Sequence, residues 1–261
     1  YVIVHGYDIS MKKIFKKWRK SYQSLIDDGA KFLPVSQLWK DRLIDIGASE
    51  TNVTVSRLGI DSSKLKFSSK SPKSPLKLLC VGRLTEKKGV IYAIKAAAHF
   101  PNDLALDVVG DGDLFCELSS YIKENDIGNV NMLGSLPHNA VIELFDSADV
   151  FILPSITAAN GDMEGIPIVL MEAMATGKLV VSTQHSGIPE LINNKEEGFL
   201  VEERNIQQLI DVLGIILDDK TDLIQKVREK ALKKVLTSFD SKINTRALVE
   251  LMNQDIRNGK N

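Results

Sequence analysis

The sequence has 261 residues, 44% of them hydrophobic and 26% charged, and its formal net charge is −1. This is the composition of an ordinary globular protein, and it excludes disordered, collagenous and coiled-coil chains. No apolar run approaches the ~18 residues of a membrane span. Cys80 and Cys116 lie in apolar contexts without metal-ligand spacing, which favours a reduced compartment and predicts a cytoplasmic protein.

The first section of the chain is basic and predicts part of an α/β unit. Residues 1–75 carry 14 Lys and Arg against 7 Asp and Glu, whereas the rest of the chain carries 19 against 27. The pattern of apolar residues predicts strands at 1–4, 31–35 and 53–56 and helices at 9–26 and 37–46. An α/β domain usually needs roughly 100–200 residues. We therefore expect residues 1–61 to be the C-terminal part of an N-terminal domain that is incomplete in this chain.

A Ser-, Lys- and Pro-rich stretch at 62–75 predicts a linker, after which the pattern becomes regular. Short apolar strands alternate with helical patterns, which predicts a doubly wound parallel sheet over residues 76–238. We expect strands at 77–81, 105–109, 130–133, 150–153, 179–182 and 198–201, and helices at 88–99, 113–125, 139–147, 166–176, 205–217, 221–236 and 241–257. The last helix, within residues 239–261, is expected to pack back toward the first section.

The stretch from Glu164 to Glu172 follows a predicted strand and carries the most informative chemical pattern. Pro167 suits the first turn of a helix over 166–176, and Gly165 lets the backbone approach a ligand closely. The free amides and dipole of a helix N-terminus favour phosphate. Glu164 and Glu172 could therefore hold two parts of one elongated ligand, with phosphate between them. The alternative is a capped helix whose Glu172 is solvated or paired.

Two more loops follow strands, at the sheet edge where open α/β domains bind ligands. In residues 82–89, Arg83 offers a planar fork for phosphate oxygens and a lysine offers a mobile charge. The alternative is a basic turn that satisfies helix carbonyls. In the next loop, Gly110 permits close approach to a nucleotide. Asp111-x-Asp113 imitates a known metal-binding D-x-D motif, but the surrounding fold pattern is wrong for it, so no metal site is expected.

These motifs form an ordered series along the chain. They are GRLTEKKG (82–89), GDGD (110–113), LGSLP (133–137), ADVFILPS (148–155), EGIPIVLMEAMATG (164–177) and SGIPELI (186–192). The series resembles the C-terminal domain of family-4 retaining glycosyltransferases of the GT-B fold, in particular bacterial exopolysaccharide (colanic-acid-type) and lipopolysaccharide enzymes. VIVHGYDIS and the Gly-Ile-Asp before the linker resemble the end of that family's N-terminal domain. The resemblance implies two Rossmann-like doubly wound domains, the first incomplete here.

Position by position, the resemblance implies a site for a nucleoside-diphosphate sugar. Arg83 and Lys88 would hold the donor diphosphate, with Lys87 less suited by its position. Glu164 would bind hydroxyls of the donor sugar. The segment of Gly165, Ile166, Pro167 and Ile168 would face sugar and phosphate with its backbone amides. Pro167 belongs to this segment but has no N–H to donate.

The remaining roles implied by the resemblance concern the nucleoside and the opposing domain. Glu172 would accept hydrogen bonds from the ribose, and backbone around Leu136 would contact the base. His5 matches an active-site histidine beside the donor sugar, and the alternative is a satisfied histidine at a strand end. The family's usual Gly-Gly is here Ser186-Gly187. The other histidines, namely His99, His138 and His185, are expected to be surface or core residues.

The expected reaction follows from the charges that develop when an anomeric C–O bond breaks. Fixed cations and helix amides stabilise the leaving diphosphate, so neither a metal nor a cofactor is expected. The resemblance implies a hexosyltransferase that moves a sugar to a hydroxyl of a saccharide or lipid-linked acceptor. It also implies retention through front-face attack, with His5, Glu164, Arg83 and Lys88 as the catalytic residues.

Other functions fit parts of the pattern. A GT-B epimerase would turn over the sugar nucleotide without an acceptor, and a phosphorylase would need a pyridoxal-binding lysine context, which the sequence lacks. A non-catalytic nucleotide-binding module is a third alternative, and the presence of Arg83, Lys88, Glu164 and Glu172 argues against it. No nucleic-acid partner is expected. The basic helix at 9–26 fits peripheral contact with the inner face of a membrane, or simply a domain helix with a solvated basic face.

Overall fold

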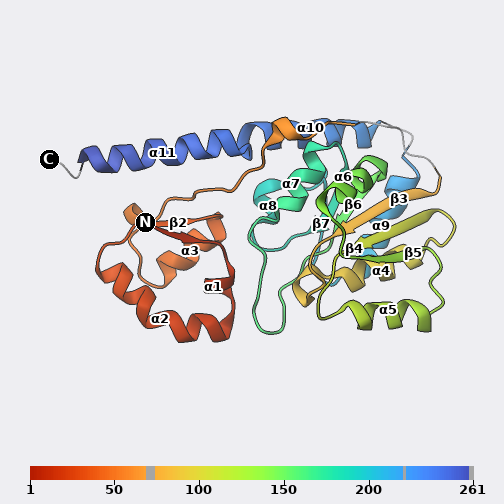
Figure 1. Cartoon of the computed structure of the whole chain (residues 1–261), viewed down its shortest axis with the longest axis horizontal. Coiled ribbons are helices and arrows are strands. Elements are labelled where there is room, and N and C mark those ends of the chain that lie inside the picture. The colour runs from red at the N-terminus through yellow and green to blue at the C-terminus, as the bar shows by residue number, and fades with distance from the viewer. Residues whose placement is uncertain (69–73, 220–221, 259–261) are drawn as a thin grey trace.

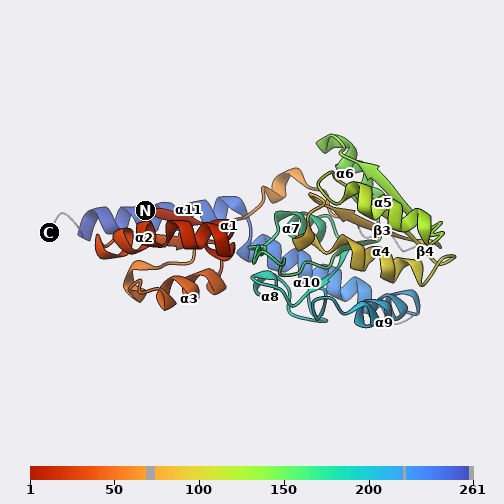
Figure 2. The same ribbon diagram turned by 90° about the horizontal axis from the view of Figure 1, so that it is seen from below.

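The computed structural model describes residues 1–68, 74–219 and 222–258. In this part of the chain a small parallel sheet and a larger one lie side by side, and the C-terminal helix extends from the larger unit along the smaller one (Figures 1 and 2). None of the helices in these ranges is both long and apolar enough to cross a membrane.

The small unit pairs β1 (Val2–Val4) with β2 (Phe32–Pro34) in parallel. Its helices are α1 (Tyr7–Ser10), α2 (Lys12–Asp27) and α3 (Gln37–Asp45), followed by a 3₁₀ turn, Glu50–Asn52. Trp39 and Leu43 of α3 are fully buried in its core. The spacing of apolar residues in α3 therefore serves packing, as the sequence predicts.

Two predictions for this unit need correction. The helix predicted at 9–26 is divided, because Met11 is extended (φ −68°, ψ 111°) and the next amide, that of Lys12, donates to the carbonyl of Asn160 in the larger unit. The segment predicted as a strand at 53–56 runs beside β2, and the amides of Thr54 and Ser56 donate hydrogen bonds to carbonyl oxygens of β2. Only Val53 forms a β-bridge, to Phe32. Both differences come from long-range contacts that local patterns do not contain.

The larger sheet has six parallel strands in the order β5-β4-β3-β6-β7-β8. Their bounds are β3 (Leu76–Val81), β4 (Leu104–Val109), β5 (Val130–Gly134), β6 (Val150–Leu153), β7 (Leu179–Thr183) and β8 (Phe199–Val201). β3 and β6 are neighbours although the chain leaves β3 for β4. The strand order reverses there, which makes the carboxyl ends of β3 and β6 a topological switch point.

Helices cover this sheet on both faces, as right-handed crossovers on either side of a switch point require. They are α4 (Val90–Ala98), α5 (Phe115–Glu124), α6 (His138–Ser147), α7 (Ile168–Ala175), α8 (Ile188–Leu191), α9 (Ile206–Leu217) and α10 (Leu223–Ser238). In Figure 1, α7 and α10 lie together above the sheet and α4 lies below it. The short helix α8 was not predicted; the others lie where helical patterns were found.

Chain segments outside the two sheets join the units. Asp255 of α11 (Ser241–Asn258) accepts a hydrogen bond from the Tyr1 hydroxyl and pairs with Lys31. The predicted linker at 62–75 contains a 3₁₀ turn, Ser62–Lys64, and Ser68 then donates to the carbonyl of Thr176. Residues 69–73 lie outside the described residues. The first part of the predicted linker is therefore packed against the larger unit.

Candidate functional site

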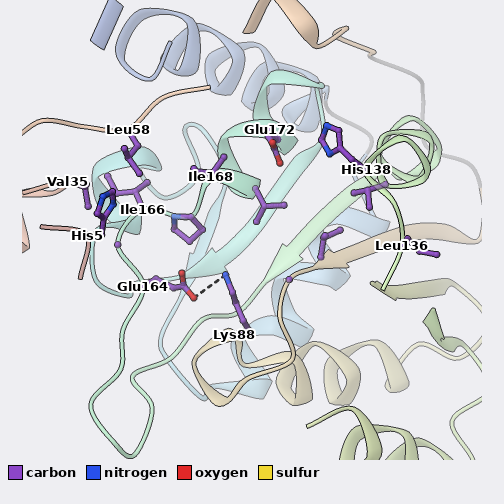
Figure 3. Close-up of a pocket in the computed structure, with 16 residues that line it drawn as sticks. His5, Val35, Leu58, Lys88, Leu136, His138, Glu164, Ile166, Ile168 and Glu172 are labelled. Carbon is purple, nitrogen blue, oxygen red and sulfur yellow. Dashed lines mark ion pairs between the residues drawn. The ribbon is translucent and has the colours of Figure 1, made fainter. Parts of the chain in front are cut away.

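A cleft of about 590 Å³ opens at the carboxyl ends of the strands, between the two units (Figure 3). The small unit contributes His5, Val35 and Leu58 to its lining. The larger unit contributes Val81 and Gly82 after β3, Lys88, Leu136, His138, Val141, all residues from Glu164 to Val169, and Glu172. The cleft therefore lies at the topological switch point of the larger sheet, where doubly wound domains bind nucleotides.

Lys88 and Glu164 face each other across the floor of this cleft (Figure 3). Lys88 Nζ lies 3.1 Å from Glu164 Oε1, and the two side chains are only 14% and 10% exposed. The contact is close enough for an ion pair, but its angles do not make a hydrogen bond, so Oε1 is buried without a hydrogen-bond donor. The other carboxylate oxygen, Oε2, is not enclosed in this way, and an ionised carboxylate oxygen can accept from a ligand hydroxyl in the cleft.

The backbone before α4 determines where Lys88 points. Lys88 ends the 3₁₀ turn Glu86–Lys88, and Gly89 follows with a left-handed φ of 62°. A Cβ on Gly89 would meet the carbonyl oxygen of Pro154 at 1.9 Å, so only glycine fits there. Lys87, one residue earlier, pairs instead with Asp162 at 3.2 Å and is not among the lining residues.

The backbone of residues 165–168 forms one wall of the cleft and leads into α7. The sequence places the helix start at Ile166, but it begins at Ile168, with Pro167 as N-cap in an extended conformation (φ −63°, ψ 122°). Gly165 packs against the small unit, and a Cβ there would lie 2.9 Å from the carbonyl oxygen of His5. A proline disfavours the helical conformation in the residue before it, so Ile166 does not start the helix. The N-terminus of α7 still opens into the cleft.

Glu172 lies on α7 with His138 near it, at the first residue of α6 (Figure 3). Burial raises the pKa of the Glu172 carboxyl, although the charge of His138 acts in the opposite direction. The sequence predicts a surface or core position for His138; its side chain is exposed at the surface, and it also lines the cleft. Its place directly after the LGSLP motif is the signal that could have identified it.

The other predicted site residues are divided between the cleft and its margin. His5 and Leu136 line it. Arg83 follows the lining residue Gly82, but its own side chain is exposed and is not part of the lining. Gly110 is also outside the lining, because its close approach is to another backbone: a Cβ there would meet the carbonyl oxygen of Gly82 at 1.9 Å. Gly110 therefore supports the loop that carries Arg83.

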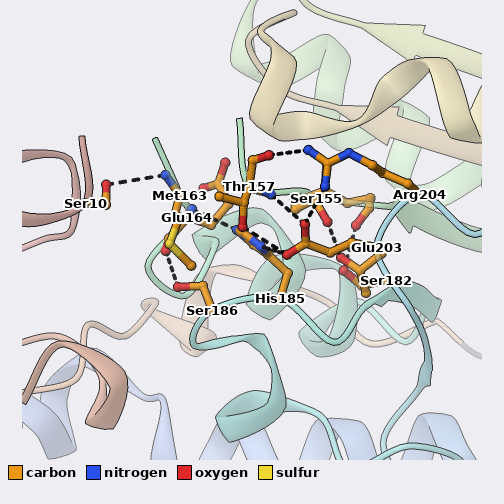
Figure 4. A network of polar contacts seen from close by, with 12 residues as sticks. Ser10, Ser155, Thr157, Met163, Glu164, Ser182, His185, Ser186, Glu203 and Arg204 are labelled. Atoms are coloured by element: carbon orange, nitrogen blue, oxygen red, sulfur yellow. Dashed lines mark hydrogen bonds and ion pairs between the residues drawn. The ribbon is translucent and has the colours of Figure 1, made fainter. Parts of the chain in front are cut away.

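A polar network behind Glu164 was not predicted (Figure 4). His185 is fully buried, and its Nε2 accepts from the backbone N–H of Glu164 at 3.1 Å. Its Nδ1 lies 2.7 Å from Glu203 Oε1. Burial acts to raise the pKa of Glu203, but hydrogen bonds from Thr157 and His185 outweigh it and lower that pKa. The core position foreseen for His185 is correct, but its contact with the cleft residue is new.

No group of three or more His, Cys, Asp or Glu side chains in the described ranges is arranged to hold a metal ion. In the Asp111-x-Asp113 motif, Asp111 Oδ1 accepts from the amide of Gly112 at 2.7 Å, which is a local turn contact. The cleft instead offers a lysine, backbone amides and two carboxylates.

This arrangement can be compared with known proteins. The family model described as "Glycosyl transferases group 1" matches residues 61–234. The chain belongs to this family. It is 38% identical over 255 residues to the amylovoran biosynthesis glycosyltransferase AmsK of Erwinia amylovora, covering 96% of this chain and 62% of AmsK. It is equally 38% identical to WcaL of Escherichia coli strain K12, whose name assigns it to colanic acid biosynthesis, covering 63% of that protein.

The chain thus spans less than two thirds of the length of these curated relatives. A structural relative is HepE of Anabaena, solved in complex with UDP-glucose, with a TM-score of 0.81 and 22% identity over 97% of this chain and 72% of HepE. At that identity the likeness concerns the fold. The predicted family and the predicted GT-B-type α/β fold of this group 1 glycosyltransferase are confirmed.

Proposed function

We propose that this chain is the donor-binding part of a glycosyltransferase for cell-surface polysaccharide. The enzyme would move a sugar from a nucleoside-diphosphate sugar to a hydroxyl of a saccharide or lipid-linked acceptor. The observation that carries the proposal is one cleft lined by Lys88, Glu164, the segment from Gly165 to Ile168, and Glu172. The names of AmsK and WcaL support a role in exopolysaccharide synthesis, and the UDP-glucose complex of HepE supports a sugar-nucleotide donor.

The lining residues divide the donor among them. Lys88 and the N-terminal amides of α7 hold the diphosphate, because a fixed cation and oriented N–H groups favour phosphate. Arg83, exposed at the margin, closes on the same phosphates. Glu164 accepts from hydroxyls of the sugar through the carboxylate that it contributes to the cleft lining. Glu172 accepts from the ribose, while the backbone at Leu136 contacts the base.

The chemistry rests on charge that develops during bond cleavage. As the anomeric C–O bond breaks, negative charge grows on the leaving diphosphate, and Lys88 with the amides of α7 stabilises it without a metal. His5 approaches the same space from the small unit, as an active-site histidine beside the donor sugar. Retention by front-face attack, with the departing phosphate taking the acceptor proton, is part of the proposal and comes from the family resemblance.

The proposed location is the cytoplasmic side of a membrane. Cys80 and Cys116 are both free thiols, which suits a reduced compartment. On α2 the basic side chains are all exposed, and Trp18 is 48% exposed with Lys17 Nζ 5.2 Å above its ring. A helix of this kind binds anionic headgroups. The alternative, a solvated helix face, predicts equal sedimentation with phosphatidylglycerol and phosphatidylcholine vesicles; the membrane role predicts binding to phosphatidylglycerol alone.

A thermal-shift screen tests the donor proposal. UDP, GDP and ADP are compared, each alone and as its glucose conjugate. One base should raise the melting temperature by several degrees, because a ligand that binds only the folded state stabilises it. Alanine at Lys88 should abolish that shift. The proposal would be contradicted if none of the six compounds raised the melting temperature. It would also be contradicted if the compounds raised the melting temperature of the Lys88→Ala variant equally.

A further inference from the structure

Residues 185–187 hold the peptide groups on both sides of Glu164 (Figure 4). His185 Nε2 accepts from the Glu164 N–H at 3.1 Å, and Ser186 Oγ donates to the Glu164 carbonyl oxygen. Gly187 N–H then donates to the carbonyl oxygen of Gly165 at 3.3 Å. Because the two flanking peptide groups fix the direction of the Cα–Cβ bond, these contacts determine the direction in which the Glu164 side chain leaves the backbone toward the cleft.

The contact from His185 requires one tautomer of the imidazole ring. Nε2 can accept the Glu164 N–H only when it carries no proton itself, so the proton must be on Nδ1. Nδ1 lies 2.7 Å from Glu203 Oε1, which accepts that proton in a hydrogen bond. The opposite tautomer would place an N–H against the N–H of Glu164. The carboxylate of Glu203 therefore selects the ring state that holds Glu164.

Glu203 is itself fixed by contacts from another loop. Its Oε2 accepts from the amide of Thr157 at 2.8 Å, and the Thr157 hydroxyl lies 3.2 Å from Oε1. Arg204 donates to Oε2 at 3.1 Å and also to the carbonyl of Thr157. The result is a continuous chain of hydrogen bonds from the turn after β8, through the buried imidazole, to the backbone of the cleft.

We infer that His185, kept in its Nδ1–H tautomer by Glu203, is a positioning residue that aims Glu164 at the sugar of the donor. The inference rests on the proposed function, because it takes Glu164 to bind the sugar. His185 is fully buried and is not among the residues that line the cleft, so it acts through Glu164 alone. Its loss should therefore affect the sugar part of the donor and not the nucleotide part.

The test compares affinities for a nucleoside diphosphate and its sugar conjugate by calorimetry, with UDP and UDP-glucose, or the GDP or ADP pair if the screen selects it. His185→Leu should leave the affinity for the free diphosphate within about twofold. The same substitution should lower the affinity for the sugar conjugate, relative to that for the free diphosphate, by about tenfold. This is the loss expected for one charge-assisted hydrogen bond. Glu203→Gln should do the same, because its single amide oxygen cannot stand both at Oε2, where the backbone N–H of Thr157 donates, and at Oε1, where His185 donates. His185→Gln keeps an acceptor for the Glu164 amide and should retain most of the preference.

A double-mutant cycle separates positioning from general destabilisation. Once Glu164→Ala has removed the sugar contact, adding His185→Leu should change the affinity ratio little, because positioning acts only through that carboxylate. His99→Leu, the same substitution at an exposed histidine at the end of α4, is the matched control and should change nothing. If His185→Leu does not fold, Glu203→Gln and His185→Gln make the same comparison.

The outcomes distinguish this inference from the function on which it rests. If the unmodified protein binds none of the probes, the proposed function fails and the inference fails with it. If Glu164→Ala lowers the affinity ratio but neither Glu203→Gln nor a folded His185→Leu does, the function stands and the inference is overturned. Additive losses in the double-mutant cycle also overturn it.

Discussion

The charge of Lys88 is the most direct target for testing the donor site. Its side chain is 14% exposed, and its ammonium nitrogen already lies 3.1 Å from Glu164 Oε1. A unit charge about 4 Å from a phosphate contributes about 4 kcal/mol at an effective dielectric constant of 20. Because the Glu164 carboxylate offsets part of this field, we expect the smaller figure for a hydrogen bond to a charged group, about 1.5–3 kcal/mol. Lys88→Ala should therefore weaken nucleoside-diphosphate binding roughly 10- to 100-fold.

Titration calorimetry with a nucleoside diphosphate and its parent nucleoside measures this loss. The nucleoside lacks phosphates, so Lys88→Ala should leave its affinity nearly unchanged. Lys87→Ala is the matched control, because the neighbouring lysine pairs with Asp162 and does not line the cleft. A nucleoside affinity that falls as far as that of the diphosphate, or an equal effect of Lys87→Ala, would refute the reasoning.

The same substitution has a separate effect on stability. Without Lys88, the Glu164 carboxylate, which is 10% exposed, loses its cation. An uncompensated buried charge is costly, and for a cleft open to water we expect about 1–2 kcal/mol, below the figure for a fully buried pair. The melting temperature should fall by about 2–4 °C per kcal/mol. Adding Glu164→Gln should restore the melting temperature but not the affinity, which separates the two effects.

Three further predictions follow from individual residues. Glu172→Gln should raise the melting temperature at neutral pH while weakening nucleotide binding. The pKa of Glu172 is raised in the folded protein, so folding stability falls as pH rises above the ordinary value of 4.5, and the gain from Gln should shrink toward that pH. Arg83→Ala should weaken diphosphate binding about tenfold, as for one charged hydrogen bond, without changing the melting temperature, because its side chain is exposed. Gly187→Ala should destabilise the protein by about 1–3 kcal/mol through overpacking, since its Cβ would lie 2.7 Å from Ile166 Cγ1. Gly128→Ala is the control and should not destabilise the protein, because a Cβ there lies in open space. Equal unfolding curves for the two glycine variants would contradict this.

Local patterns in the sequence carry most of the fold. Strands such as Val150–Leu153 are short apolar runs because a parallel sheet is buried on both faces, and they can be recognised without knowing their neighbours. Their alternation with helices predicts the doubly wound sheet, and the motifs at strand ends predict which edge binds a ligand. Glu164 and Glu172 could be assigned to one cleft for the same reason, because both lie in the segment that follows the strand Val150–Leu153 at that edge.

Contacts between distant segments were decided only by the tertiary structure. Next to the extended Met11, Lys12 donates a hydrogen bond to Asn160, and Gly165, just before α7, packs against His5. His185 meets Glu203 and Glu164 only after β7, β8 and the loop before α7 have assembled. The sequence by itself determined the elements, their order and the chemical types at the sheet edge, since these follow from periodicity and spacing. Which charges pair, and which buried groups hold the cleft in place, depends on side chains far apart in the chain, and no local pattern records such contacts.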